Sequence, residues 1–333
     1  MHRENCVAQI STVGECKIYL EDFMPYDLML EESNDFDKRI KNAMSFYSWC
    51  ASRMIPPDRT YAKEILNSIG ASQSVTDRER AQIALSYHCL SLLDVFWVKE
   101  ENEKIRFEDI NLFAHSLSNA LVDIALRGHQ MTVTNAHLLA NDLSTGGLYP
   151  KAWVRKEDGF YLYKDGGRDA VEREVLASKI CRCFDCHQVL YEQGMFENEP
   201  VSISKIMTSQ RYSLVTYAAY DVYCTNHDWN TLDKILELDA PSYYMMNILD
   251  YLVGNTDRHW ENWGLLVDNE TNQPIRLHDL MDFNRAFQQY DTPEGANCLT
   301  VGKRHLSQKD AAVEAVRNIG LNQVRQVEHT VFS

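Results

Sequence analysis

A polar loop, GNTDRHWENWG at positions 254–264, most constrains what this chain can fold into. An apolar helical pattern precedes it over 241–253, and Gly254 suits the end of that helix. Two short apolar runs follow at 265–267 and 275–277, separated by the turn-rich residues DNETNQP. This arrangement is typical of a β-hairpin. The sequence therefore predicts a polar loop held between a helix and a hairpin.

The polar residues around this hairpin suit phosphoryl transfer. Asp257 precedes Asn262 by five positions, and Asp282 follows the hairpin directly before Phe283. A hydroxyl that attacks a phosphate needs a carboxylate to accept its proton, and Mg²⁺ on the phosphates prefers carboxylate and amide oxygens. Each residue alone is an ordinary turn residue. The ordered set, in its predicted structural context, favours a catalytic loop.

The run Asn-x-Asp-x-His-x-x-Asn at 255–262, followed by Leu-x-x-Leu-x-Asp at 277–282, resembles the catalytic core of the HipA-like kinases. That family is similar to eukaryotic protein kinases and to the phosphoinositide-kinase-like group. The resemblance implies that Asp257 is the base and that Asn262 and Asp282 are Mg²⁺ ligands. Asp279 is an alternative metal ligand.

Two positions depart from the family pattern. Glu261 stands where many relatives carry Lys, and Asn284 replaces the glycine of an Asp-Phe-Gly motif. The acidic residue could weaken charge compensation at the transferred phosphate. The family pattern therefore does not by itself predict full activity.

A second informative stretch is LSTGGLYPKA at 143–152. Gly146 and Gly147 would let the backbone approach phosphates, and successive amides in such a turn form an anion nest. The spacing is not that of a Walker A loop. The resemblance implies a phosphate loop with Ser144 at its head. In this loop Gly146, Gly147 and Lys151 would cover the phosphates of the nucleotide. It also makes Ser144 a candidate autophosphorylation site.

Two strands are predicted at 151–155 and 160–164, joined by a Glu-Asp-Gly turn. Lys164 shares a strand face with Leu162, so it would project toward the glycine loop. A helix over 170–181 follows and carries Glu172 and Glu174. In kinases such a Lys contacts the α- and β-phosphates and is held by a helix Glu. Glu174 fits this role, and Glu172 is the alternative because helix phase is not fixed by sequence.

The alternating residues 201–207 predict a strand that runs into a hinge, where an adenine could meet the backbone at Ile206 and Met207. An ordinary edge strand is an equal alternative. We place His259 at the ATP site, where with Arg258 it is expected to stabilise the loop. Helices are predicted over most of 212–253 and over 309–319.

The N-terminal third carries no chemical motif. Short alternating runs at 7–10 and 17–20 indicate a hairpin. A capping box at Thr76 opens a helix that we expect to reach Leu90, and another helix is expected over 107–126. A helical period before Pro56 predicts a helix whose apolar stripe lies in the core, namely Phe36, Ile40, Met44, Tyr47 and Met54.

Composition limits the partners and the compartment. The formal net charge is −15, which argues against nucleic acid and anionic lipid as direct partners. The chain has no run of eighteen apolar residues and no signal-peptide pattern, so we expect a soluble, cytoplasmic protein. The nine cysteines do not form a disulfide framework. The cluster CRCFDCH at 181–187 contains a Cys-x-x-Cys-His, but we expect a helix-to-strand junction with partly buried thiols there.

We therefore expect an α+β chain with a bilobal protein-kinase-like fold. Residues 1–135 would form a mainly helical accessory domain, 136–208 the small lobe and 209–333 the large lobe. The expected activity is ATP- and Mg²⁺-dependent phosphoryl transfer to Ser/Thr hydroxyls of a protein. A lipid kinase, a small-molecule kinase, a nucleotidyltransferase or an inactive nucleotide-binding scaffold are alternatives. The resemblance also implies an antitoxin-type protein partner, as some family members have.

Overall fold

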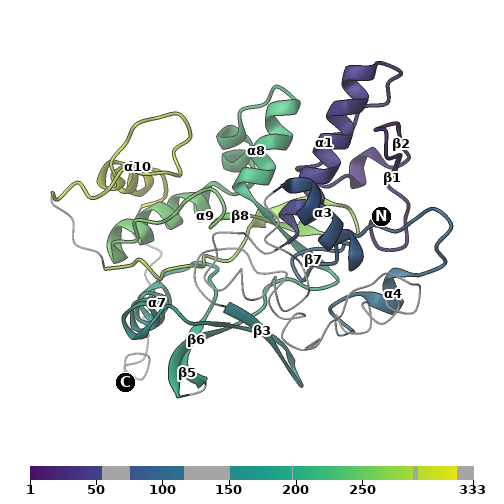
Figure 1. Ribbon diagram of the computed structural model, residues 1–333. Coiled ribbons are helices and arrows are strands. Elements are labelled where there is room, and N and C mark those ends of the chain that lie inside the picture. Colours follow the sequence, from purple (N-terminus) through teal and green to yellow (C-terminus); the bar gives the residue numbers. More distant parts are fainter. Residues whose placement is uncertain (55–75, 116–150, 197, 288–291, 321–333) are drawn as a thin grey trace. The chain divides into compact units, whose positions relative to one another are not determined.

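The computed structural model describes residues 1–54, 76–115, 151–196, 198–287 and 292–320 (Figure 1). The chain divides into two compact units. The first contains Met1–Val154, Thr208–Ser213 and Asn269–Asn272, and the second contains Arg155–Met207, Leu214–Asp268 and Gln273–Ser333. The described residues form both helices and antiparallel sheets, which confirms the predicted α+β class. Among them, no helix combines the length and the apolar character needed to cross a membrane.

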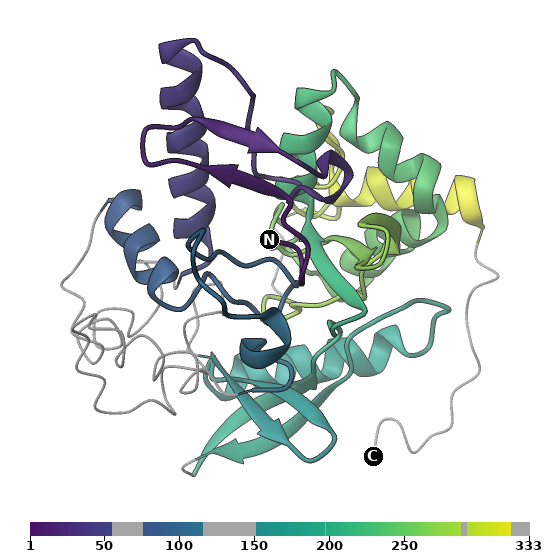
Figure 2. The same ribbon diagram turned by 90° about the vertical axis from the view of Figure 1, so that its right-hand side faces the viewer.

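The first unit begins with a small hairpin that packs on a helix (Figure 2). Strands β1 (Ala8–Ile10) and β2 (Cys16–Ile18) pair antiparallel, which confirms the predicted hairpin. The short 3-10 helix η1 (Glu21–Phe23) and helix α1 (Phe36–Ser52) follow. The side chain of Asn42, in α1, donates hydrogen bonds to the carbonyls of Gly14 and Glu31. Polar bonds from a buried asparagine thus fix the hairpin and the loop on the helix.

The apolar stripe predicted for α1 is wrong in its first half. Phe36, Ile40 and Met44 are 73%, 42% and 66% exposed, whereas Trp49 and Cys50 are buried. The hairpin and the loop cover the face that carries Asn42, because its amide satisfies their backbone carbonyls. The helical period was therefore correct, but the buried face was not.

Two further helices of this unit are shorter than predicted. Helix α3 (Asp77–Ser86) has the predicted capping box at Thr76 but ends before Leu90. Helix α4 (Phe107–Ile110) stops at Asn111, whose side chain donates to the carbonyls of Phe107 and Glu108. An asparagine that bonds nearby backbone groups competes with helical hydrogen bonds. The helix predicted over 107–126 is thus confirmed at 107–110 and wrong over 111–115, and its remainder lies outside the described residues.

A four-stranded antiparallel sheet has the order β3-β4-β6-β5. Its strands are β3 (Lys151–Lys156), β4 (Gly159–Lys164), β5 (Tyr191–Phe196) and β6 (Glu199–Lys205). Helix α7 (Arg168–Cys181) packs against β5 and β6. The β3–β4 hairpin and the helix after it confirm the predicted elements. Strand β6 is a central strand, so the edge-strand alternative is wrong.

The other part of the second unit surrounds a smaller sheet with the order β7-β8-β9. Its elements are β7 (Tyr212–Thr216), α8 (Tyr217–Asn226), α9 (Thr231–Val253), β8 (Gly264–Asp268), β9 (Gln273–Leu277) and α10 (Gln308–Ile319). Helices α9 and α10 pack side by side (Figure 1). These elements confirm the predicted helices and the hairpin after the polar loop.

Three local features position the helix and the strand on either side of the polar loop at 254–264. Helix α9 is kinked at Asp239, whose carboxylate accepts the amide of Ser242, so a new helical segment starts near Pro241. Gly254 ends the helix in the left-handed conformation, with φ 62°. At Gly264, a Cβ atom would lie 2.1 Å from the carbonyl oxygen of Val215. Only glycine therefore lets β8 begin so close to β7.

We expect His278 to make the protein less stable in mild acid. Burial lowers the pKa of His278 from 6.5 to about 4 in the folded protein. The unfolded chain therefore binds a proton first, and stability is lost as the pH falls from about 6.5 to about 4, by up to about 3 kcal/mol. Urea unfolding of His278→Gln between these pH values should show a smaller loss than the wild type. The same pH dependence in both proteins would contradict this assignment, and His227→Gln, at an exposed histidine, is the control.

Candidate active site

Lys164 lies at the end of β4 and is buried against a helix carboxylate. Its Nζ is 2.6 Å from Oε1 of Glu174, in α7. The other oxygen of Glu174 accepts a hydrogen bond from Ser202, which is the antiparallel partner of Lys164 on β6. Glu174 is 1% exposed, so both of its oxygens are satisfied by the sheet inside the protein. This geometry fixes the position of the lysine ammonium group.

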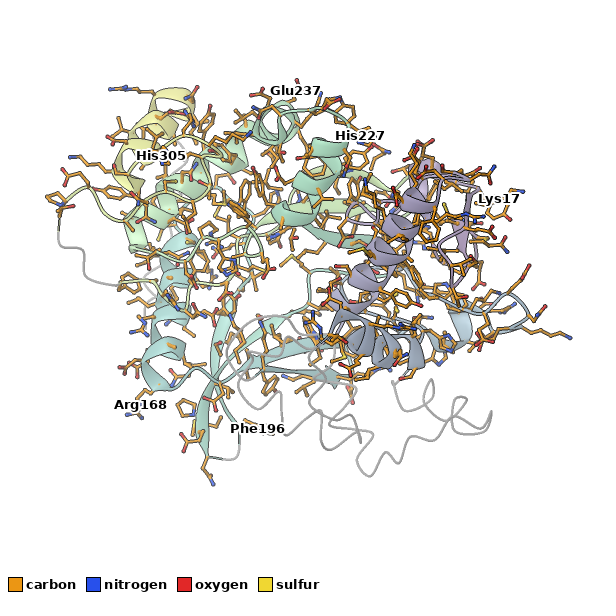
Figure 3. All side chains as sticks on the ribbon, turned by 45° about the horizontal axis from the view of Figure 1, so that its top comes forward. Lys17, Arg168, Phe196, His227, Glu237 and His305 are labelled. Carbon is orange, nitrogen blue, oxygen red and sulfur yellow. The ribbon has the colours of Figure 1, made fainter. Side chains whose placement is uncertain are left out.

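The structure separates the two candidate glutamates on α7. Glu172 pairs with Arg168, one helical turn earlier, with 3.8 Å between its Oε1 and the arginine Nε. Both side chains are more than half exposed. Figure 3 shows Arg168 reaching outward from the start of the helix. Glu174, not Glu172, is therefore the partner of Lys164 in this structure.

Glu174→Gln is expected to weaken nucleotide binding, whereas Glu172→Gln is not. The amide would lose the charge that holds Lys164 in place, while Glu172 faces solvent. Loss of one charge-assisted bond of this kind corresponds to roughly a tenfold change or more in affinity. Titration of Mg²⁺ and ATP into both variants measures the difference. Equal affinities in the two variants would show that this ion pair does not organise the site.

Asp282 also contacts Lys164. Its Oδ1 lies 2.9 Å from the lysine Nζ, although the two residues are 118 positions apart in sequence. The amide of Asp282 donates to the hydroxyl of Tyr191, and the ring of Tyr191 lies 5.4 Å from the lysine Nζ. Asp282 has φ 62°, a conformation that is uncommon outside glycine and that often marks functional positions.

The charge on Lys164 is secured by its surroundings. Burial alone would lower the pKa of Lys164, but the carboxylates of Asp282 and Glu174 outweigh it and hold this pKa well above its usual value. The lysine is therefore a permanent cation over the accessible pH range. A permanent, fixed cation is suited to phosphate oxygens.

The loop between α9 and β8 holds Asp257 and Asn262 next to each other. The side-chain amide of Asn262 donates to the backbone carbonyl of Asp257 at 2.7 Å. That bond uses the NH₂ group, so the amide oxygen of Asn262 is left to act as an acceptor or a metal ligand. The carboxylate of Asp257 lies 3.4 Å from Nε of Arg285 and is 28% exposed. The loop thus presents an accessible carboxylate beside an oriented amide.

Arg258 ties this loop to the elements around it. The guanidinium forms two 2.9 Å bonds to the carboxylate of Asp250, in α9. Its remaining nitrogen donates to the carbonyls of Asn262 and Met281. Arg258 is 3% exposed, and Asp250 is 4% exposed. One buried arginine therefore connects the helix, the amide residue of the loop and the residue before Asp282.

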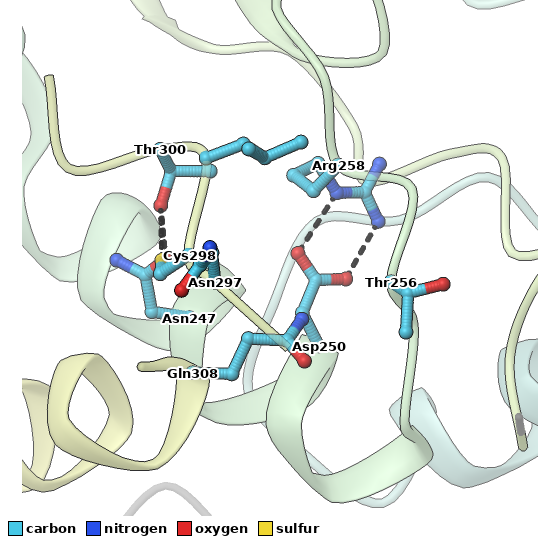
Figure 4. Close-up of a pocket in the computed structure, with 9 residues that line it drawn as sticks. Asn247, Asp250, Thr256, Arg258, Asn297, Cys298, Thr300 and Gln308 are labelled. Atoms are coloured by element: carbon cyan, nitrogen blue, oxygen red, sulfur yellow. Dashed lines mark hydrogen bonds and ion pairs between the residues drawn. The ribbon is translucent and has the colours of Figure 1, made fainter. Parts of the chain in front are cut away.

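A small polar pocket lies behind the loop, next to the Arg258–Asp250 pair (Figure 4). Thr256 lines it from the loop, and Thr300 lines it from the segment before α10. Thr300 donates to Asn247, and Gln308 donates to the carbonyl of Asn255. These bonds support the loop from the side of α9 and α10.

The remaining loop residues have less central positions. The ring Nδ1 of His259 accepts the amide of Glu261, so this histidine shapes the loop locally. Glu261 is exposed. Asp279, the alternative metal ligand, pairs with Arg276 at 2.8 Å, whereas Asp282 contacts Lys164. Of the two aspartates, Asp282 is the one that the structure brings to the buried lysine.

Other predicted site residues are placed only in part. The amide of Ile206 donates to the carbonyl of Phe160, so it extends the sheet. Met207 ends a segment of the second unit, where the chain passes into the first. Lys151 is the first residue of β3. Ser144, Gly146 and Gly147 lie outside the described residues, so the phosphate loop remains a prediction.

The donor chemistry fits Mg²⁺. Asn262 supplies a neutral amide oxygen whose orientation is set by its bond to Asp257. Asp282 supplies a carboxylate, and Arg258 joins the backbone beside both residues. Mg²⁺ is commonly held by one or two such oxygens, with water and phosphate completing its shell. Asn262 and Asp282 are thus suitable ligands.

Several supporting residues were missed from the sequence. Ser202 and Tyr191 bond to the groups around Lys164, and Asp250 pairs with Arg258. The two serines of β6, Ser202 and Ser204, are buried, so the inward face of this strand is its polar face. Buried serines opposite a strand lysine were the available signal. The segment at 181–187 follows the prediction, because α7 ends at the buried Cys181 while Cys183 and Cys186 are partly buried.

No protein-family model matches the sequence, and no curated protein is similar to it. The structure is similar to that of the Helicobacter pylori proinflammatory kinase CtkA, with 16% identity over 53% of this chain and 77% of the other and a TM-score of 0.43. It is also similar to HipA in the Shewanella oneidensis toxin–antitoxin complex with HipB and operator DNA. That match has 12% identity over 84% of this chain and 74% of the other, and its TM-score is also 0.43. At these values the likenesses carry no argument about function, which rests on the site residues.

Proposed function

We propose that this chain transfers the γ-phosphoryl group of ATP, with Mg²⁺, to a Ser or Thr hydroxyl of a protein. The observation that carries the proposal is the position of Lys164. Its ammonium group contacts Glu174 and also Asp282, the residue that the motif makes a metal ligand. A buried lysine held between a helix glutamate and such an aspartate is the arrangement that kinases use around the nucleotide phosphates.

In this proposal, each side chain has a separate task. Lys164 neutralises and orients the α- and β-phosphates. Asn262 and Asp282 would hold Mg²⁺, which would offset the negative charge of the phosphates. Asp257 accepts the proton of the hydroxyl as its oxygen bonds to the γ-phosphorus. The bond from that phosphorus to the β,γ-bridging oxygen breaks, and its electron pair leaves with ADP.

The remaining parts of the proposal come from the motif resemblance. Gly146, Gly147 and Lys151 would cover the phosphates, and Ile206 and Met207 would lie near the adenine. Because the amide of Ile206 is used in the sheet, its contact would be made by other atoms. Ser144 is the proposed autophosphorylation site. His259 belongs to the ATP site as a residue that shapes the loop.

A protein partner of the antitoxin type belongs to the same proposal. Its support is the motif resemblance alone, and we propose no direct contact with nucleic acid because the formal charge is −15. Size-exclusion chromatography with the product of a neighbouring gene tests the partner. A gel-shift assay with the chain alone tests the second statement, and a shift at physiological salt would contradict it.

Labelled nucleotides test the proposed reaction. The protein is incubated with Mg²⁺ and with ATP labelled at either the γ- or the α-phosphate. We expect γ-label alone to be transferred, and we expect transfer to be lost in Lys164→Met but kept in Lys205→Met. Lys205 is a matched control because it is an exposed strand lysine paired with Asp158. Transfer of the α-label would instead identify a nucleotidyltransferase, and the absence of ATP binding would refute a nucleotide site altogether.

A further inference from the structure

The loop that carries Asp257 has no free permanent cation. Its arginine, Arg258, is buried and bound to Asp250, so it is not available to a substrate. Glu261 is exposed and acidic. A phosphoryl group in transfer carries negative charge on its outer oxygens, and positive groups near it normally offset that charge. In this chain the cation has to come from outside the loop.

Arg285 lies where such a cation is needed. Its Nε is 3.4 Å from Oδ2 of Asp257, and its side chain is 43% exposed. Among the residues that the structure describes, it is the only lysine or arginine within ion-pair distance of Asp257. It follows Asp282, the proposed metal ligand, by three positions in the sequence and pairs with Asp257, the proposed base.

The ion pair with Asp257 does not account for Arg285 as a residue that stabilises the fold. A half-exposed ion pair at this distance contributes little to stability, because water and salt screen it. Within the described part of the chain, Arg285 has no second ion pair or side-chain hydrogen bond. Its two terminal nitrogens form a planar fork that matches two oxygens of a phosphate.

We infer that Arg285 is a catalytic residue that contacts the transferred phosphoryl group and replaces the cation that the loop lacks. Without nucleotide, it rests against Asp257. With nucleotide, its guanidinium binds the outer γ-phosphate oxygens, and Asp257 is released to accept the hydroxyl proton. The bonds made and broken are those of the proposed reaction, and Arg285 exchanges no proton. This inference rests on the proposed function.

Three variants test the role in catalysis. Arg285→Gln is expected to lower kcat for transfer of the γ-label from ATP roughly 100-fold, with a smaller effect on the KM for ATP. Arg304→Gln is the matched control, because Arg304 is a similarly exposed arginine paired with Glu314 in the same unit. The double variant Glu261→Lys/Arg285→Gln should recover a large part of the lost rate, because lysine returns a cation to the loop. Normal activity of Arg285→Gln, or no recovery in the double variant, would overturn the inference.

A binding measurement separates this inference from the proposed function. Arg285 is expected to favour Mg²⁺-ATP over Mg²⁺-ADP, because only ATP has the γ-phosphate. Arg285→Gln should reduce this preference by about tenfold while the affinity for ADP stays unchanged. An unchanged preference would refute the role of Arg285, even if the wild type transfers phosphate normally. Conversely, a wild type that binds no nucleotide would refute both the function and this inference.

Discussion

Replacing Asp257 by Asn is expected to reduce phosphoryl transfer by about 10³-fold without loss of the fold or of nucleotide binding. The amide cannot accept the hydroxyl proton. The change leaves the backbone carbonyl of Asp257 in place, so Asn262 keeps its hydrogen bond. The side chain is 28% exposed, and among the described residues its one ion pair is with Arg285 at 3.4 Å, so its charge contributes little to stability. Single-turnover transfer of γ-labelled phosphate measures the effect.

Asp279→Asn is the control for this substitution. Asp279 has a similar exposure, 26%, and pairs with Arg276 rather than with Lys164. We expect it to retain most of the activity. Equal losses in both variants would mean that the measurement reports general damage to this region. Full activity of Asp257→Asn would remove Asp257 from the role of base.

The second large effect is on stability. Arg258→Met is expected to lower the free energy of unfolding by about 3–5 kcal/mol, because it leaves the carboxylate of Asp250 buried without its partner. The carbonyls of Asn262 and Met281 would also lose a donor. Arg258→Lys should not restore the wild-type stability, because one ammonium cannot reproduce the paired bonds to Asp250. Urea unfolding measures both variants.

A double-mutant cycle shows whether the pair acts as a unit. Arg258→Met combined with Asp250→Leu should be less destabilised than the sum of the two single variants, because neither charge is then left alone. Arg276→Met is the control at a more exposed pair and should cost no more than about 1 kcal/mol. Additive losses in the cycle would show that Arg258 and Asp250 do not support the loop together.

The polar loop and its flanking elements could be predicted because their signals are local. Gly254 ends a helix, and DNETNQP turns a hairpin, whatever the rest of the chain does. The order of Asp257, Asn262 and Asp282 then identified a candidate site. The same is true of the β3–β4 hairpin with Lys164 at its end.

The remaining parts of the site depend on pairings that local sequence does not contain. The choice of Glu174 over Glu172 depends on the rotation of α7 against β6, and the role of Ser202 depends on strand register. The pair of Asp250 and Arg258 joins a helix to a loop. In α1, a side-chain amide decided which face was buried, against the apolar pattern. Such long-range choices explain both the missed residues and the wrong stripe.

The most direct test is a crystal structure with Mn²⁺ in place of Mg²⁺ and a non-hydrolysable ATP analogue. Anomalous scattering would locate the metal without reference to the expected site. We predict a metal ion bound by the side-chain oxygen of Asn262 and the carboxylate of Asp282, with the ammonium of Lys164 on the α- and β-phosphates. A metal or nucleotide bound elsewhere, with Lys164 still enclosed by Glu174 and Asp282, would contradict the assignment of this site.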